Sequence, residues 1–464
     1  MTYLVQLDDN LTNDIFRHVE QRDLRSLALS CKALKRRAEP LLYETIDWTW
    51  QAARDEKRNP QTQLLLRSVV QNSRLGSHVK HVSFQAVGYR VSRDESKPTS
   101  TPKLKPKELA RAIEAIATAG LQNPHQWQAA LADGNLDATV ALFLAQLCNL
   151  LSLSIGPDLL KNNQFLGMLF EPKPVGGIVS KFKRLKDVYL GAQIDDHDFN
   201  HYEIPLVPGQ FLPFFYLPAL RSAEMFLPDA EGRDYRARAR SEGSSIVWPL
   251  NPPRAAALTS LKLRRARATP AMLESLLIAT PKLEKLEYDW WCEWPQNLHG
   301  DDLMRALWHV RKTLVMLKVV FTPFDKEPII LQERGEEWLS EPLGSLRGFL
   351  KLRYLEISLV VLLGYYDTTA ARLSDVLPPN LLAVCFRDDL WGFSYWPWEE
   401  EQSLLKFEEF LQDGWRNSTP KLQRLNLRID TCDSDWGPAG RKTLIKACKK
   451  QGLKCGIIKT ESND

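Results

Sequence analysis

A short apolar motif recurs along most of this chain, and it limits the folds that the chain can adopt. The motif is a leucine or valine, two further residues, an apolar residue, one residue and a second apolar residue. Its last two apolar positions alternate with other residues, which is the period of a β-strand with one buried face. The copies are Val79-Val82-Phe84, Leu150-Leu153-Ile155, Leu185-Val188-Leu190, Leu220-Ala223-Met225, Leu258-Leu261-Leu263, Leu283-Leu286-Tyr288, Leu314-Leu317-Val319, Leu352-Leu355-Ile357, Leu381-Val384-Phe386 and Leu422-Leu425-Leu427. They predict a series of short strands in sequence order.

Helical patterns lie between several of the predicted strands. Apolar residues at helical spacing predict helices over 107–118, 136–147, 270–277, 301–307, 404–411 and 443–449. Asn135 and Thr269 precede two of these helices and are suitable N-caps. A helix–turn–strand unit cannot bury its own apolar face, so neighbouring units are expected to stack. The pattern predicts an α/β fold with a parallel sheet, and the alternative is a doubly wound α/β sheet.

The first 48 residues follow a different pattern, with short helices in place of strands. Leu11 and Ile15 are four residues apart and predict one apolar stripe along a first helix. Asp23 is the expected N-cap of a second helix, and Pro40 is expected in the first turn of a further one. Three helices in so short a segment bury little surface alone. We therefore expect this segment to pack on a partner or on the following domain.

The apolar residues of this segment also follow a recognisable order. A leucine, an isoleucine–phenylalanine pair, an aspartate–leucine pair, a leucine and a cysteine occur at Leu7, Ile15, Phe16, Asp23, Leu24, Leu27 and Cys31. This order resembles the F-box, and residues 38–43 resemble the tail common in fungal members of that family. Asp8 stands where the family has a proline. The resemblance implies a three-helix unit over 1–48 that docks on a Skp-type adaptor of a cullin–RING ubiquitin ligase.

The resemblance also implies which side chains bind the adaptor. They are Leu7, Leu11, Ile15, Phe16, Leu24, Leu27 and Cys31. The alternative is that these residues form the core of a helical cap and contact no adaptor.

The remaining residues, 49–464, resemble the degenerate leucine-rich repeats that follow fungal F-boxes. The clearest copy is TPAMLESLLIATPKLEKLEY, residues 269–288. The resemblance implies an irregular solenoid, with a curved parallel sheet inside and helices outside. A polar insertion near 90–106 and long loops near 191–213, 228–253, 322–342 and 387–401 interrupt the repeats. Such insertions often carry the binding function of a repeat protein.

Composition narrows the class of partner. The chain has 61 Lys and Arg against 57 Asp and Glu, a net charge of +4, which favours neither nucleic acid nor an anionic membrane as the main partner. The longest apolar run, 357–363, is too short to span a membrane, and no secretory signal is expected. The seven cysteines are scattered without a CxxC pair, which favours a cytoplasmic or nuclear location.

Two groups of residues are candidates for substrate binding. The first comprises charged residues at the strand positions that alternate with buried ones: Lys262, Arg264, Glu287, Asp289, Lys318, Glu356, Arg387 and Arg428. The second comprises tryptophans that follow predicted strands: Trp291, Trp294, Trp391 and Trp396. The alternatives are that the charged residues are ordinary solvated positions and that the tryptophans are buried.

No pattern of catalytic residues is recognisable. HExxH, GxSxG, P-loop and GxGxxG motifs do not occur in the sequence. The acidic cluster around His197 is more typical of a solvated loop than of a metal site. We therefore expect no catalytic residue, metal or cofactor.

The expected function is a substrate receptor of a Skp–cullin–F-box ubiquitin ligase, which marks a protein substrate for proteasomal degradation. It would act by raising the effective concentration of substrate beside a separate enzyme. A non-ligase scaffold built from the same modules is the alternative, and an enzyme on an α/β sheet is a second one.

Overall fold

Two compact units, Met1–Arg221 and Ser222–Asp464, make up the chain. The computed structural model describes residues 8–51, 62–87, 103–156, 159–160, 163–173, 176–191, 208–226, 246–266, 269–293, 298–324, 339–367, 369–388, 398–430 and 436–460. Most of the predicted insertion near 90–106 and most of the predicted long loops lie outside these ranges, although Pro106 begins a helix. The domain boundary expected at residue 48 stays a prediction.

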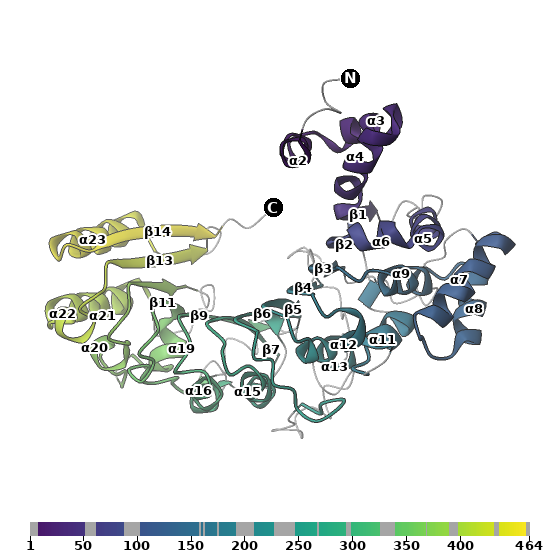
Figure 1. Cartoon of the computed structure of the whole chain (residues 1–464). Helices are drawn as coiled ribbons and strands as arrows, with labels where there is room; N and C mark the ends of the chain where they lie inside the picture. The colour runs from purple at the N-terminus through teal and green to yellow at the C-terminus, as the bar shows by residue number, and fades with distance from the viewer. Residues whose placement is uncertain are drawn as a thin grey trace. The chain divides into compact units, whose positions relative to one another are not determined.

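The first unit begins with three helices and continues with alternating helices and strands (Figure 1). Its elements are α2 (Asp9–Arg17), α3 (Gln21–Ser30), α4 (Lys32–Glu44), β1 (Thr45–Gln51), α5 (Thr62–Gln71), α6 (Ser73–His78), β2 (His81–Val87), α7 (Pro106–Thr118), α8 (Pro124–Ala132), α9 (Leu136–Ala145), β3 (Ser152–Ile155), α11 (Gln164–Phe170), α12 (Ile178–Lys181), β4 (Asp187–Leu190), α13 (Pro208–Phe211) and the 3₁₀ helix η2 (Leu212–Tyr216). The strands are parallel and ordered β1-β2-β3-β4.

The second unit repeats this arrangement with more strands. Its elements are β5 (Ser222–Phe226), β6 (Ser260–Ala266), α15 (Pro270–Ala279), β7 (Lys285–Glu293), β8 (Leu298–His299), α16 (Gly300–Trp308), β9 (Met316–Phe324), β10 (Leu339–Glu341), β11 (Tyr354–Ser358), α19 (Leu359–Leu363), α20 (Leu373–Val376), β12 (Ala383–Arg387), α21 (Glu400–Gln412), α22 (Trp415–Ser418), β13 (Arg424–Asp430), α23 (Pro438–Lys450) and β14 (Lys454–Thr460). The parallel order is β5-β6-β7-β9-β11-β12-β13-β14, and β8 pairs separately with β10.

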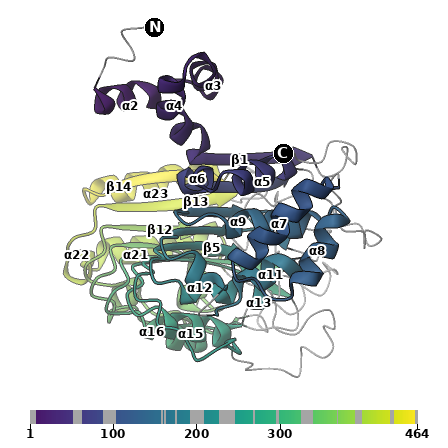
Figure 2. The same cartoon turned by 45° about the vertical axis from the view of Figure 1, so that its right-hand side comes forward.

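The core of each unit lies between the strands and a layer of helices. From α5 onward, the helices of each unit lie on one side of its strands (Figure 2). Every residue of the predicted apolar motif is buried, with at most 5% of its surface exposed. The predicted α/β class and parallel strands are therefore confirmed. The doubly wound alternative is wrong for each unit, because that fold has helices on both faces and a strand order that reverses.

Two strands of the parallel arrays lie outside the predicted series. They are β1 (Thr45–Gln51) and β14 (Lys454–Thr460), each at one end of the strand order. A strand with one neighbour buries less of its surface, and Ile46 and Trp48 of β1 are only half-buried. Such strands carry a weak apolar pattern, which is why the motif does not reveal them.

The helix starts show which local signals act. Asn135 Oδ1 accepts from the Ala138 N–H at 2.9 Å, and Thr269 Oγ1 accepts from the Met272 N–H at 3.4 Å, so both predicted caps are confirmed. Asp23, in contrast, lies inside α3.

Pro40 lies inside α4 and does not open a new helix, so that prediction is wrong. The helix continues past this residue because Leu41 and Leu42 pack on the same apolar core as Leu34 and Ala38. Tertiary packing there outweighs the local cost of proline.

Helix α9 is buried along its whole length and carries one carboxylate into the core. Asp137 Oδ2 accepts from the Phe165 N–H at 2.6 Å, and Oδ1 accepts from the Leu166 N–H at 3.0 Å. These are free N–H groups of the first turn of α11, so a side chain of one helix caps the start of another. Burial raises the pKa of Asp137 to about 7, although the two donated hydrogen bonds lower it.

The raised pKa of Asp137 predicts a pH-dependent stability. The folded pKa of about 7 exceeds the ordinary value of 3.8, so the folded state holds a proton that the unfolded chain releases. The free energy of unfolding should therefore fall as pH rises from about 4 to about 7, by up to about 4 kcal/mol. Urea denaturation followed by circular dichroism from pH 4 to 8 would measure this fall in the wild type and in Asp137→Asn, which cannot titrate at this position. A difference between the two proteins that does not change with pH would contradict the prediction.

Candidate protein-binding surfaces

The N-terminal helices α2, α3 and α4 share a small apolar core. Phe16 and Leu24 are 1% and 6% exposed, and they pack with the buried Leu34 and Ala38. Five half-buried residues surround this core: Val19, Leu27, Ala28, Leu41 and Leu42. Three of the predicted adaptor-binding residues, Phe16, Leu24 and Leu27, therefore stabilise the helical unit itself.

Other apolar side chains of the same helices face solvent. Leu11 and Ile15 of α2 are 50% and 38% exposed, and Leu29 of α3 is 79% exposed. Cys31 is also exposed, whereas Leu7 lies outside the described residues. Leu29 was not among the predicted residues. Its exposure could have been predicted, because helical spacing places it on a different face of α3 from Leu24 and Leu27.

A polar network fixes α2 on α4. Asp8 caps α2, since its carboxylate accepts from the Asn10 N–H at 3.2 Å. Thr12 Oγ1 donates to the Asp8 carbonyl at 2.9 Å and accepts from Arg37 of α4 at 3.2 Å. Asp8, which stands where the F-box pattern has proline, therefore starts the helix by capping it.

On the sheet of the second unit, charges of alternating sign occupy neighbouring strands. Glu224, Lys262, Glu287, Lys318 and Glu356 share one register row across β5, β6, β7, β9 and β11. Successive members lie 3.7, 3.8, 3.9 and 3.7 Å apart, measured between lysine Nζ and carboxylate oxygen. We call these five residues the charge row. It is a chain of ion pairs in which each of the three inner members has a partner on either side.

Arginines close both ends of the charge row. Arg264 Nε lies 2.5 Å from Glu224. Glu356 pairs with Lys318, with Arg387, and with Arg428 Nε at 2.9 Å, the last as an ion pair without good hydrogen-bond alignment. Burial acts to raise the pKa of Glu356, but the three cations outweigh it and lower the pKa. Glu356 is therefore the most strongly held carboxylate of the row.

Cys385 follows Glu356 in the register, on β12, and is buried. Burial and the neighbouring Glu356 raise the pKa of the Cys385 thiol to about 11. This thiol stays protonated at neutral pH, so it is a poor nucleophile.

The structure brings most of the predicted charged candidates together. Seven belong to the charge row or to its ends: Lys262, Arg264, Glu287, Lys318, Glu356, Arg387 and Arg428. Asp289 lies two residues further along β7 and is half-buried. Glu224 was missed, although it alternates with Ala223 and Met225 as Lys262 does with its own buried neighbours. Whether any of them binds a substrate stays a prediction.

Two tryptophans that neighbour the predicted ones, Trp290 and Trp398, lie among the described residues. Trp290 is 1% exposed and packs on Phe321, with ring centroids 5.3 Å apart. Trp398 is 8% exposed, and its Nε1 donates to the Gly364 carbonyl at 2.9 Å. Both are packing residues. The candidates Trp294, Trp391 and Trp396, and the side chain of Trp291, lie outside the described residues.

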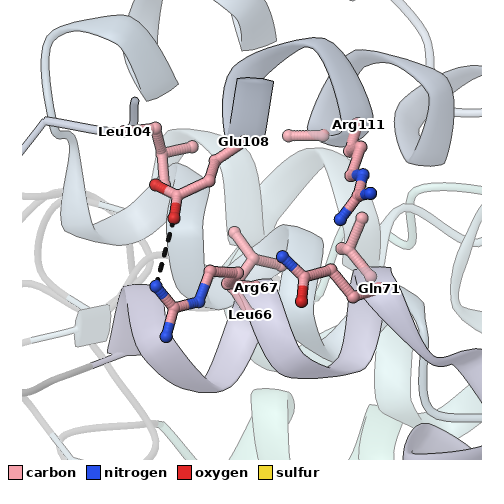
Figure 3. A pocket seen from close by; sticks show the side chains of 8 residues that line it. Leu66, Arg67, Gln71, Leu104, Glu108 and Arg111 are labelled. Atoms are coloured by element: carbon pink, nitrogen blue, oxygen red, sulfur yellow. Dashed lines mark hydrogen bonds and ion pairs between the residues drawn. The ribbon is translucent and has the colours of Figure 1, made fainter. Parts of the chain in front are cut away.

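A shallow groove lies between α5 and α7 (Figure 3). Leu66 and Arg67 line one side, Glu108 and Arg111 the other, and Arg67 forms a 3.2 Å ion pair with Glu108. The groove encloses about 250 Å³, including space open to solvent. Little of this volume is enclosed by side chains, so the groove is small for a substrate.

Among the described residues, no group of three or more His, Cys, Asp or Glu is placed to hold a metal ion, and the cluster around His197 lies outside those residues. Within the same ranges, every helix is too short or too polar to cross a bilayer. No family model matches the chain, and no curated protein matches its sequence.

Proposed function

We propose that this protein is the substrate-recognition subunit of a Skp–cullin–F-box ubiquitin ligase. Helices α2–α4 would bind the Skp-type adaptor, and the remaining residues would hold a protein substrate as an irregular leucine-rich-repeat solenoid. The support for the solenoid is that each unit has parallel strands in sequence order with helices on one side. A separate enzyme would transfer ubiquitin, and this chain would contribute proximity.

The observation that carries the docking proposal is the exposure of Leu11 and Ile15. The small core of α2–α4 is formed by other residues, and Leu11 and Ile15 keep 50% and 38% of their surface exposed outside it. Full burial of an exposed leucine or isoleucine is worth about 1.5–3 kcal/mol, so covering the exposed part of each of these two side chains is worth roughly half of that. Together with Leu29, the two residues give the unit apolar surface that a partner could cover.

Charge reversal of the apolar positions tests the docking. The double variant Leu11→Asp and Ile15→Asp should weaken binding of a purified Skp-type adaptor at least about 30-fold, because two carboxylates would be desolvated. Isothermal titration calorimetry would measure the affinity. The matched control is Leu405→Asp with Ile445→Asp, which are 61% and 40% exposed on α21 and α23. Adaptor binding that survives in a folded double variant would remove the docking proposal.

For the substrate, the charge row on the sheet of the second unit is the proposed contact. Its alternating charges favour a polar segment whose own charges alternate, because such a segment can replace the ion pairs that it breaks.

Reconstitution of the complete ligase with this chain distinguishes a substrate receptor from a scaffold. A scaffold would bind the adaptor, but its co-purified partner would not be ubiquitinated by the assembled ligase.

A further inference from the structure

The strands of the second unit all begin at the same edge, because they are parallel. The turns that lead into them lie side by side there. Thr313 Oγ1, before β9, donates to the Leu283 carbonyl, before β7, at 2.6 Å. Asn380 Nδ2, before β12, donates to the Leu350 carbonyl, before β11, at 2.8 Å. The side chains of these turns therefore form one continuous strip of surface.

This strip is strongly basic. Six cations lie in the turns before β7, β9, β11 and β13 or at the first residue of a strand: Lys282, Lys312, Lys351, Arg353, Lys421 and Arg424. We call these six residues the basic edge. All are exposed, and none forms an ion pair with a described residue. In the turns 280–285, 309–316, 345–354, 377–383 and 419–424, Glu284 is the one acidic residue.

The basic edge differs from the charge row in the state of its cations. In the charge row, each lysine has a carboxylate partner: Lys262 lies 3.7 Å from Glu224, and Lys318 lies 3.7 Å from Glu356. Arg387, at the end of the row, also pairs with Glu356. An acidic partner would compete with these ion pairs. At the basic edge it would displace only water and counterions.

Large apolar side chains are interleaved with the cations. Leu350 is 63% exposed beside Lys351, and Tyr354 is 48% exposed beside Arg353. Trp308, at the end of α16, is 46% exposed. A partner that covers this strip meets positive charge and apolar surface together.

We propose that the basic edge binds an acidic polypeptide segment that also carries apolar side chains. The cations form a row along one edge, which suits a linear anion better than a membrane plane. Four strand spacings of about 4.8 Å span roughly 19 Å, the length of about six residues of extended chain. A nucleic-acid duplex would match the charge with its phosphates but would leave Leu350 and Tyr354 without apolar partners, so single-stranded DNA is the nucleic acid that the test must include.

Fluorescence anisotropy with the full chain tests the proposal. The probe is a fluorescein-labelled peptide of alternating glutamate and leucine, compared with a version that has glutamine in place of glutamate. The triple variant Lys351→Glu, Arg353→Glu and Arg424→Glu should bind the acidic peptide at least tenfold more weakly. The matched control reverses three exposed cations on α23 and at the far end of β14, Lys442, Lys446 and Lys459. It should bind as the wild type does.

Two further measurements keep the proposal falsifiable if the triple variant folds poorly. Binding to the wild type should weaken with rising salt, and Leu350→Ser should weaken it about threefold. The proposal is overturned if the glutamine peptide binds equally well or if the control variant loses as much affinity. It is also overturned if single-stranded DNA or phosphatidylserine vesicles bind more tightly than the acidic peptide. None of these results depends on adaptor docking by α2–α4.

Discussion

Replacement of Glu356 by alanine is expected to lower the free energy of unfolding of the second unit by about 3 kcal/mol. The variant would leave Lys318, Arg387 and Arg428 close together without their shared carboxylate. Arg387 is 11% exposed at its side chain, so water can compensate only in part. Urea denaturation would measure the loss, and hydrogen exchange would localise it to β9, β11, β12 and β13.

A matched control comes from the same charge row. Glu287 pairs with Lys262 and Lys318 at 3.8 and 3.9 Å, and its side chain is 30% exposed. Glu287→Ala should therefore cost less than about 1 kcal/mol. Adding Arg428→Gln to Glu356→Ala should restore part of the lost stability, because it removes one of the three cations that Glu356 held. Equal losses for the two glutamates would contradict a special role for Glu356.

The sign of the pH dependence follows from the lowered pKa of Glu356. The carboxylate stabilises the folded state above its ordinary pKa of about 4.5, and this contribution is lost as pH falls through the lower folded pKa. The stability difference between wild type and Glu356→Ala should therefore be largest at neutral pH and shrink in acid.

The second large effect is expected from Phe16→Ala, which should unfold the N-terminal helices. Phe16 is 1% exposed in a small core whose other buried members, among the described residues, are Leu24, Leu34 and Ala38. Loss of a buried phenylalanine costs about 3–5 kcal/mol, and a unit this small has little stability to lose. Hydrogen exchange over 9–44 should become fast, while the strands of the second unit stay protected. The control, Leu29→Ala, removes a side chain that is 79% exposed and should leave exchange unchanged.

These variants distinguish residues that stabilise the helical unit from residues that bind the adaptor, although the F-box-like motif contains both kinds. Phe16→Ala would weaken adaptor binding by unfolding the unit, whereas Leu11→Asp with Ile15→Asp would weaken it in a folded unit. Slow exchange over 9–44 in Phe16→Ala would contradict the packing role that its burial assigns to it.

The strands were predictable because their pattern is local. In a copy such as Leu283-Leu286-Tyr288, each apolar residue reports directly that its position faces the core. Helix ends were less predictable, since they depend on contacts distant in sequence. Pro40 is the clearest example, because the helix continues through it to reach a core that Phe16 and Leu24 build from other helices.

The candidate surfaces were predictable in position but not in electrostatic state. Period-two alternation identified Lys262 and Glu287 as residues of one sheet face. It could not show that register brings them to 3.8 Å and neutralises them. The basic edge was missed for a related reason, since lysines in turns are ordinary until the stacking of turns collects them.

The alternating charge row limits how this chain can evolve. Repeat proteins change length by duplication and deletion of whole units. Loss of the unit that carries Lys318 would bring Glu287 beside Glu356, and like charges on neighbouring strands are destabilising. Loss of two adjacent units would keep opposite charges together. Through this part of the sheet, viable descendants should therefore differ by an even number of repeats.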